Sequence, residues 1–301
     1  MKGIVKFFIG LVAFLVLGLL ILLITALVLI NMTPNKLKVG DKVIINGKSC
    51  NDLGIGDVKI KTMINDFNDI KGKKNVVQNP FDKTSAEEEL TPIFTNFDLI
   101  TDGNLDFQKL YSTGLDSGST KYYEYSDTTI AYVINSSLSY MTGDAETLTN
   151  FKFNVAEMSF YGNKKEMRIV YRVDISEFKQ NLEKAIPSFV SRFIGMPKEV
   201  YLVTYYDVNV STTGRLELGC KGIYLNDVDT PFSNAILRSV STENSSLEDY
   251  GQSLGDAISE AVSYLGKIGT CTHSGDNITD SSSISYGIDG YQNGKIGMIC
   301  G

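Results

Sequence analysis

The sequence predicts an α+β fold, with an N-terminal transmembrane helix followed by an antiparallel β-sheet body that a few amphipathic helices pack against. Three observations support it. Residues 7–30 form a charge-free apolar run, residues 151–175 alternate apolar and polar side chains about a glycine-containing turn, and residues 177–194 and 247–265 repeat apolar side chains at helical spacing. We expect one antiparallel sheet of about six to eight strands, with those two helices packed on it.

The apolar run is the clearest signal in the sequence. From Phe7 to Ile30 only two glycines and one threonine depart from strongly apolar or alanine character. A helix of about 24 residues, at ~1.5 Å rise per residue, reaches ~36 Å and exceeds the ~30 Å hydrocarbon core of a bilayer. The alternatives are a buried core helix or a cleaved signal peptide, but residues 31–34 offer no small-residue cleavage site. We therefore expect an uncleaved single-pass anchor.

The anchor divides the chain into three predicted parts. Residues 1–31 are the cytoplasmic tip and transmembrane anchor, residues 32–56 a juxtamembrane segment, and residues 57–301 an α+β extracytoplasmic body. Two lysines precede the apolar run and three follow it closely, so lysine counts alone leave the orientation open. Because the short end of such a chain commonly stays inside, we expect a cell-membrane protein whose C-terminal body is extracytoplasmic.

The acidic charge of the body excludes some partners. The whole chain has a net charge of -7, and the two lysines ahead of the apolar run leave about -9 on the remainder. Such a body lacks the basic surface that nucleic acids require, and anionic lipid head groups would repel it. The sequence contains no glycine-rich phosphate-binding motif in a strand–helix setting, so no nucleotide cofactor is predicted.

The four cysteines are widely spaced and include no CxxC pair. They are Cys50, Cys220, Cys271 and Cys300. In an oxidising compartment they can form two disulfides, and of the three connectivities we favour Cys271–Cys300 with Cys50–Cys220. Buried free thiols are an equally good interpretation of so few cysteines.

Apolar spacing and turn residues place the other elements. Helices are predicted over residues 58–70, 128–141, 177–194, 231–240 and 247–265. Residues 71–92 are predicted to form a loop with room for one helical turn, and the segments around Asp102–Asn104 two extended pieces joined by a turn. Strands are predicted on both sides of Tyr161–Lys164, at 200–210 and 215–225, and in the tail at 284–288 and 295–299.

Residues that commonly carry catalysis are few. His273 is the only histidine and lies in a polar loop, where a solvated side chain is a better interpretation than a catalytic base. Asp227 and Asp229 lie close together after a strand, a position more typical of a solvated loop or a helix start than of an acid–base pair. We therefore predict no catalytic residues.

A metal site is the next alternative. Asp276, Asn277 and Asp280 could supply oxygen ligands to calcium, but their spacing does not match the twelve-residue calcium loop. A turn in which the side chains bond their own backbone explains these residues better. We therefore predict no metal site.

An apolar groove is a sharper possibility. A helix over 177–194, capped by Ser176, would present Phe178, Leu182, Phe189 and Phe193 toward the strands. Curved strands facing such a helix can enclose an elongated pocket for an acyl chain. The alternative is a filled core, which we favour.

The order of these segments resembles a known family. The resemblance covers residues 125–240, about two-fifths of the chain, and is carried by residues 129–135 (TIAYVIN), 173–176 (VDIS), 196–200 (MPKEV), 214–216 (GRL) and 223–227 (IYLND). This pattern resembles the YpmS-like single-pass envelope proteins of low-GC Gram-positive bacteria, a family without an established activity. It implies a bacterial envelope protein, and the 247–265 helix and the tail have no counterpart in it.

The leading functional hypothesis is a non-enzymatic, membrane-anchored extracytoplasmic protein that binds a lipid or another envelope protein. The alternatives are an envelope-remodelling enzyme or regulator with a site in its loops, and a structural scaffold. An enzyme should show polar side chains converging in a cleft, and a lipid-binding protein an apolar groove open at one end. A scaffold should show only an exposed apolar patch.

Overall fold

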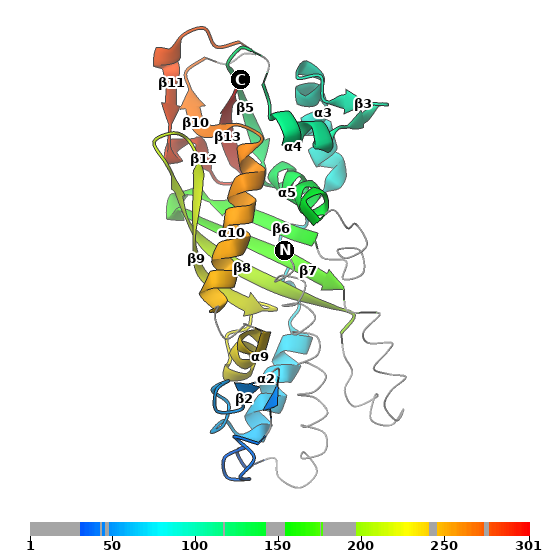
Figure 1. Cartoon of the computed structure of the whole chain (residues 1–301), viewed down its shortest axis with the longest axis vertical. Helices are drawn as coiled ribbons and strands as arrows, with labels where there is room; N and C mark the ends of the chain where they lie inside the picture. The colour runs from blue at the N-terminus through cyan, green and yellow to red at the C-terminus, as the bar shows by residue number, and fades with distance from the viewer. Residues whose placement is uncertain are drawn as a thin grey trace.

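The computed structural model describes most of the chain after the predicted anchor. The described residues are 31–42, 44–45, 48–116, 118–142, 154–174, 176, 197–240, 246–273 and 277–301. Both the apolar run at 7–30 and the predicted helix at 177–194, with its groove residues Phe178, Leu182, Phe189 and Phe193, lie outside them. Among the helices that are described, none combines the length and apolar character that a bilayer crossing requires. The described body has an α+β fold with antiparallel sheets (Figure 1).

A four-stranded antiparallel meander forms the centre of the body. Its strands are β6 (Asn154–Tyr161), β7 (Glu166–Asp174), β8 (Glu199–Val210) and β9 (Leu216–Leu225), paired in that order. The predicted hairpin is confirmed, with the turn at Gly162–Lys164. The predicted strands at 200–210 and 215–225 are confirmed as well. Two bulges, between Val155 and Glu157 and at Tyr205/Tyr206, interrupt the regular register.

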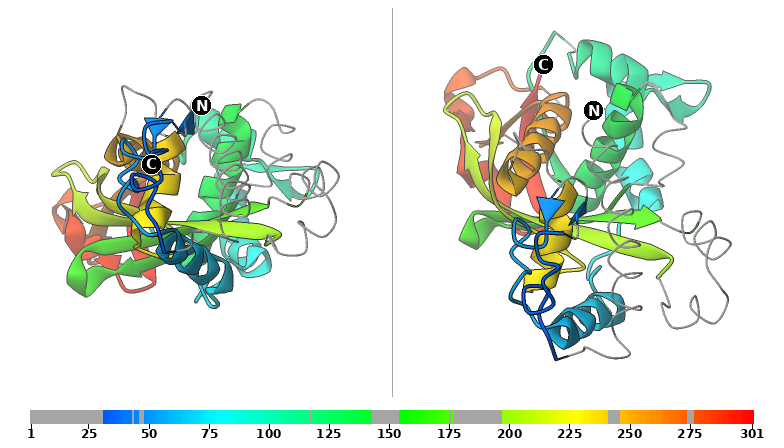
Figure 2. Two further views of the ribbon diagram at one scale, coloured as in Figure 1. Left: turned by 90° about the horizontal axis from the view of Figure 1, so that it is seen from below. Right: turned by 60° about the horizontal axis from the view of Figure 1, so that its bottom comes forward.

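The inner face of this meander carries the hydrophobic core. Helices α5 (Asp127–Thr142) and α10 (Leu247–Ser263) cover it from the same side (Figure 2). Side chains that alternate along the strands, such as Ile169 and Leu202, are at most 1% exposed. α9 (Pro231–Val240) continues this layer beyond the end of β9. The predicted helices at 128–141, 231–240 and 247–265 are therefore confirmed.

A second, smaller sheet lies at the C-terminal end of the molecule. β10 (Lys267–Cys271), β11 (Ile284–Tyr286), β12 (Tyr291–Gln292) and β13 (Lys295–Cys300) form it together with β5 (Lys121–Ser126). Its glycines permit very close backbone packing, because a Cβ at Gly290 would lie 2.5–2.8 Å from the backbone of Gly269. The prediction of a single sheet of six to eight strands is thus wrong, since the described strands divide among four separate sheets, of which the four-stranded and the five-stranded sheets are the larger ones.

The N-terminal part of the body lies at the opposite end of the long axis (Figure 1). It contains β1 (Ile44–Ile45), β2 (Lys48–Ser49) and α2 (Ile60–Gly72), the last confirming the helix predicted at 58–70. Leu53 and Ile55 are 1% and 3% exposed and belong to the main hydrophobic cluster. The described residues of the segment 48–56 therefore pack onto the body.

Two helices occupy regions that were predicted as loop or extended chain. α3 (Lys83–Asn96) lies where residues 71–92 were predicted to be a loop, because Asp82 caps it through Thr84 and its buried residues recur at helical spacing. β3 (Ile100–Thr101) and β4 (Asn104–Leu105) confirm the predicted turn. The second extended piece ends early, since Asp106 caps α4 (Phe107–Thr113) through Lys109. β5 and β10 were not predicted.

Candidate functional site

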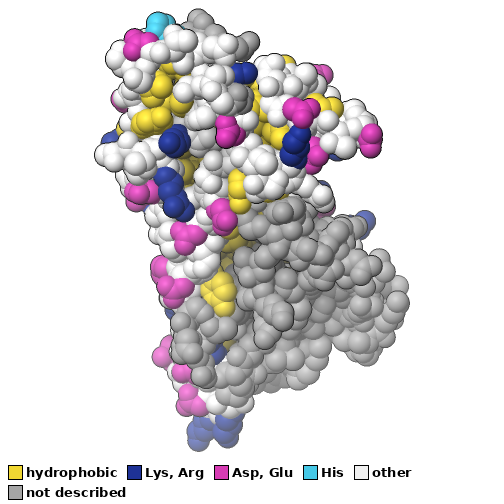
Figure 3. Space-filling view, turned by 45° about the horizontal axis from the view of Figure 1, so that its top comes forward, with side chains coloured by type: hydrophobic (Ala, Val, Ile, Leu, Met, Phe, Trp, Pro, Cys, Tyr) yellow, Lys and Arg dark blue, Asp and Glu magenta, His cyan; other side chains and the backbone are white. Residues whose placement is uncertain are grey.

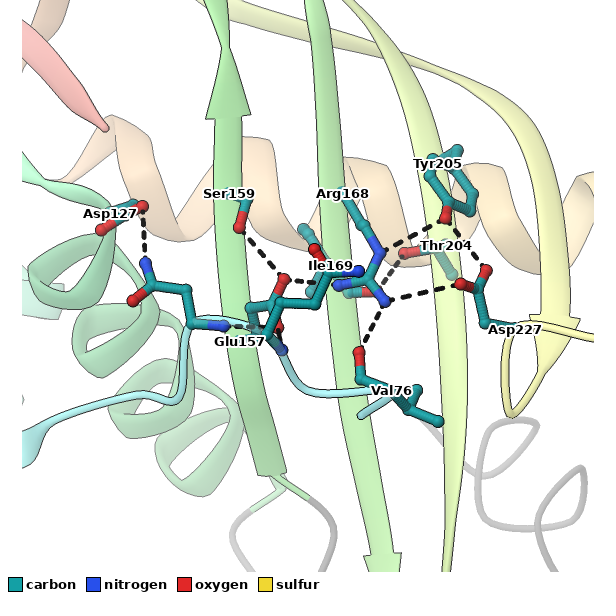
Figure 4. A network of polar contacts seen from close by, with 11 residues as sticks. Val76, Asp127, Glu157, Ser159, Arg168, Ile169, Thr204, Tyr205 and Asp227 are labelled. Atoms are coloured by element: carbon teal, nitrogen blue, oxygen red, sulfur yellow. Dashed lines mark hydrogen bonds and ion pairs between the residues drawn. The ribbon is translucent and has the colours of Figure 1, made fainter. Parts of the chain in front are cut away.

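A buried ion pair lies on the outer face of the four-stranded sheet (Figure 4). Glu157 of β6 and Arg168 of β7 form it, with side chains 0% and 3% exposed. Ser159 donates a further hydrogen bond of 3.1 Å from its Oγ to Glu157 Oε1. Removing two charges from water is costly unless their hydrogen-bonding capacity is satisfied, so the surroundings of the pair are part of the site.

An extended connection covers the ion pair. Residues 73–82, here called the crossing segment, join α2 to α3 and run over the outer sheet face. The backbone N–H groups of Gln78 and Asn79 both donate to Glu157 Oε2, the latter at 3.0 Å, while Arg168 Nη2 donates to Val76 O at 2.7 Å. Val76 also packs on Val170 and Val203. The ion pair therefore binds backbone groups of the crossing segment and fixes its path.

The other side of Arg168 leads to the surface. Its Nε donates to the Tyr205 hydroxyl at 3.3 Å, and that hydroxyl donates to Asp227 Oδ1 at 2.9 Å. Arg168 Nη2 is also 3.8 Å from Asp227 Oδ2, whose side chain is 25% exposed. Burial raises the pKa of Tyr205, the hydrogen bond from Arg168 lowers it, and the bond to the Asp227 carboxylate raises it. The net result is a raised pKa, so the phenol is a neutral donor at physiological pH.

Burial lowers the pKa of the Arg168 guanidinium, but Tyr205 and the charge of Glu157 outweigh that effect. The net result is a raised pKa, so Arg168 is a cation at physiological pH. The Arg168 guanidinium therefore carries a positive charge within the network. The carboxylate of Glu157 neutralises this charge, and the carboxylate of Asp227 lies 3.8 Å from it on the other side.

A strained turn presents Asp227. Asn226 and Asp227 both have positive φ, 51° and 58°, and they connect the bridged residues Leu225 and Val228 as a two-residue turn. Asn226 holds the turn in place, because its Oδ1 accepts from Tyr201 N at 2.6 Å and its Nδ2 donates to Ile70 O at 2.7 Å. The turn is thereby fastened both to the sheet and to the end of α2.

An open hollow of about 460 Å³ lies beside the turn. It is lined by Glu166, Tyr205, Lys221, Tyr224, Asp227 and Asp229. A neighbouring hollow of about 370 Å³ shares Lys221, Tyr224 and Asp229 with it. We call the first of these the acidic-aromatic hollow.

The lining of the acidic-aromatic hollow combines aromatic rings with excess negative charge. The rings of Tyr205 and Tyr224 meet edge to face with centroids 5.7 Å apart. Lys221 Nζ is 2.7 Å from Glu166 Oε1 and 3.2 Å from Asp207 Oδ1. The ammonium group of Lys221 is therefore ion-paired with two carboxylates of the sheet, Glu166 and Asp207. Asp227, Asp229 and the two tyrosine rings also line the hollow, and carboxylates together with aromatic rings attract cations.

The aspartates set aside in the sequence analysis have different surroundings. Asp227 is part of the polar network, whereas Asp229 is exposed and accepts a 2.9 Å hydrogen bond from Asn234 at the start of α9. Asp280 accepts from the backbone of Ser282 at 2.9 Å, which confirms the predicted turn with a self-bonding side chain. The hydrogen bonds from Ser282 lower the pKa of Asp280.

The remaining predicted candidates do not gather into a site. Asn277 and His273 are exposed, and Asp276 lies outside the described residues. Within the portion of the chain that the structure covers, no three His, Cys, Asp or Glu side chains come together as a metal site. Figure 3 shows acidic and basic side chains interleaved with small hydrophobic areas on the face it presents.

The cysteines are thiols in the structure. In the antiparallel pair of β10 and β13, Lys267 lies opposite Ile299, so Cys271 and Cys300 lie at opposite ends of the pair. The pairing of Cys271 with Cys300 therefore does not fit this fold. Burial raises the pKa of Cys50 and of Cys220, and it raises the pKa of Cys300 to about 12.

Arg168 was missed because it lies on the polar side of the predicted hairpin, which was expected to face solvent, and its partners Glu157 and Tyr205 were not singled out. A signal was present in the sequence, since Val170 lies among charged residues on this side of β7 and Val203 lies opposite it on β8. Apolar side chains on a supposedly wet face indicate that something covers it.

No protein-family model, no curated protein and no solved structure matches the chain.

Proposed function

We propose that this chain is a single-pass membrane protein of the bacterial envelope whose extracytoplasmic body binds a partner without catalysing a reaction. The charge-free run at 7–30 supports the anchor, and the YpmS-like resemblance supports the envelope setting. The acidic-aromatic hollow supports the binding role. The aromatic rings of Tyr205 on β8 and Tyr224 on β9 line it together with carboxylates of the turn after β9, and the described residues of its lining include no base–nucleophile pair.

The observation that carries the binding role is the position of Asp227. Its carboxylate accepts a hydrogen bond from the Tyr205 hydroxyl and lies close to the Arg168 guanidinium. The Asp227 side chain is still 25% exposed where it lines the hollow. A preorganised carboxylate that lines the same hollow as two tyrosine rings is suited to a cationic group. We therefore propose a basic segment of another envelope protein as the partner. A lipid ligand remains the alternative, and it depends on the apolar residues predicted at 177–194.

Asp227→Asn tests the binding role. The substitution keeps the size of the side chain and its ability to accept from Tyr205, but it removes the charge. With hexalysine as the probe at low salt, we expect the dissociation constant to rise about five- to tenfold, in proportion to one lost charge contact. Isothermal titration calorimetry of the full-length protein in detergent measures this change.

Asp102→Asn is the matched control, because Asp102 is an exposed carboxylate in the turn between β3 and β4. Equal losses in the two variants would indicate nonspecific attraction to an acidic protein and would contradict a site at the hollow. Native mass spectrometry of the same preparation distinguishes a peptide-binding protein from a lipid-binding one. A lipid that co-purifies with the protein would favour the apolar groove predicted at 177–194.

The proposed topology predicts which positions react with an impermeant reagent. A cysteine introduced at the exposed Glu88 of α3 should react with a charged maleimide in intact cells, because the body is outside. A cysteine in place of Lys2 should react only after lysis, with the four native cysteines changed to serine in both variants so that only the introduced thiol is read. The reverse pattern would place the body in the cytoplasm.

A further inference from the structure

The first described residues of the body after the predicted anchor are folded, so no flexible linker separates them from the anchor. The carbonyl of Met32 accepts from Ile60 N at 3.0 Å, and Asn35 N donates to Gly56 O at 3.0 Å. Thr33 is only 7% exposed. Residue 31 is therefore followed immediately by packed structure, and an anchor ending at residue 30 would hold the body directly at the bilayer.

The same end is basic, in contrast to the rest of the chain. Between residues 31 and 61 there are six lysines and three aspartates, whereas the whole chain has a net charge of -7. Five of these lysines are exposed, and we call them the basic end: Lys36, Lys38, Lys42, Lys59 and Lys61. Figure 3 shows Lys and Arg side chains gathered at the bottom tip of the molecule, where Figure 1 places the first described residues.

The aspartates of this region do not neutralise the basic end. Asp57 accepts from Asn35 Nδ2 at 3.0 Å, Asp41 from Asn51 Nδ2 at 2.6 Å, and Asp52 from the backbone N–H of Ser49 at 2.8 Å. These bonds to uncharged groups hold the turns of the segment together. Among the described ion pairs none includes a lysine of the basic end. Their charge is thus available to an external anionic surface.

We propose that the basic end lies against anionic phospholipid head groups of the bilayer that the predicted anchor crosses. This inference rests on the proposed membrane anchor. Ammonium groups next to a membrane span attract lipid phosphates, and the attraction acts only within about a Debye length of the surface, ~8–10 Å. The acidic remainder of the body is repelled by the same surface. The two effects together orient the long axis so that the C-terminal sheet points away from the membrane.

Lysine acetylation of the full-length protein in nanodiscs tests the proposal. In discs containing phosphatidylglycerol, lysines of the basic end should react with an acetylating ester about fivefold more slowly than in phosphatidylcholine discs, because a surface-bound lysine is favoured by roughly that factor. Lys164 and Lys295 are exposed elsewhere on the body and serve as internal controls whose rates should not change. Mass spectrometry gives the rate for each lysine.

The outcomes separate the two proposals. Equal reactivity of the basic end in both kinds of disc, with the chain incorporated, would overturn the contact with lipid and leave the anchor standing. A chain that elutes separately from the discs would overturn the proposed anchor, and with it the proposed contact between the basic end and lipid. A variant with Lys36, Lys42, Lys59 and Lys61 changed to Glu should incorporate normally, and its remaining Lys38 should react at one rate in both lipids.

Discussion

Arg168→Met is expected to lower the free energy of unfolding by about 3–5 kcal/mol, the range found when one partner of a buried ion pair is removed. The reason is the 0% exposure of Glu157, whose carboxylate would remain buried without its cation. Val76 O would also lose its donor. Urea unfolding of the full-length protein, followed by circular dichroism, measures the change.

Arg172→Met is the matched control, on the same strand and the same sheet face. The distance from Arg172 Nη1 to Glu199 Oε1 is 3.7 Å, and the two side chains are 40% and 38% exposed. The free energy of unfolding should therefore fall by less than ~1 kcal/mol. Combining Arg168→Met with Glu157→Gln should recover part of the stability, because a glutamine still accepts from Gln78 and Asn79 without leaving a buried charge. Similar losses for the two arginine variants would show that the buried pair has no special role.

Gly290→Ala is expected to destabilise the C-terminal sheet by about 3 kcal/mol, at the upper end of the range for overpacking. The new Cβ would lie 2.5 Å from the oxygen and 2.7 Å from the nitrogen of Gly269, so two backbone segments would have to separate. Hydrogen exchange should show the loss first in β10 and β13. Thermal unfolding of the same variant should give a lower midpoint.

Gly72→Ala provides the comparison, because a Cβ there meets nothing within 4 Å and the residue ends α2. Alanine should be neutral or slightly stabilising at that position, through its better helix propensity. If Gly290→Ala behaved in the same way, the close contact between Gly290 and Gly269 would not exist in solution.

Local sequence patterns were sufficient for the elements with regular periodicity. The hairpin of β6 and β7 alternates apolar and polar residues about a Gly-Asn turn, and α10 repeats its apolar residues over four turns. Such patterns depend only on neighbouring residues and were interpreted correctly. The same is true of α2, α5 and α9.

Elements specified by distant partners were not recovered. β5 has no strong alternation, and it is a strand because β13 pairs with it over six residues. α3 contains Pro92 and a run of glutamates, but Glu89 is satisfied by Ser126 and Thr129, which lie at the junction of β5 and α5. The division of the described strands into a four-stranded sheet, a five-stranded sheet and two short pairs also depends on such pairings, which neither spacing nor composition reveals.

The candidate site illustrates the same limit. Asp227 was noticed in the sequence but assigned to a solvated loop, since its partners Tyr205 and Arg168 are 22 and 59 positions away. A turn with two left-handed residues and no glycine has no strong sequence signature. What the sequence did offer was Val170 on the polar face of the hairpin, an indication that this face is covered.

The crossing segment also imposes an order of assembly. Residues 73–82 are synthesised before the strands they lie on, which extend from residue 154 to residue 210. We expect them to reach their final path after β6, β7 and β8 have paired, because contacts of long sequence separation close larger loops and form more slowly. Before this contact forms, the side chains of Val76, Val170 and Val203 are exposed to solvent. Exposed apolar side chains of this kind favour aggregation of the incompletely folded chain.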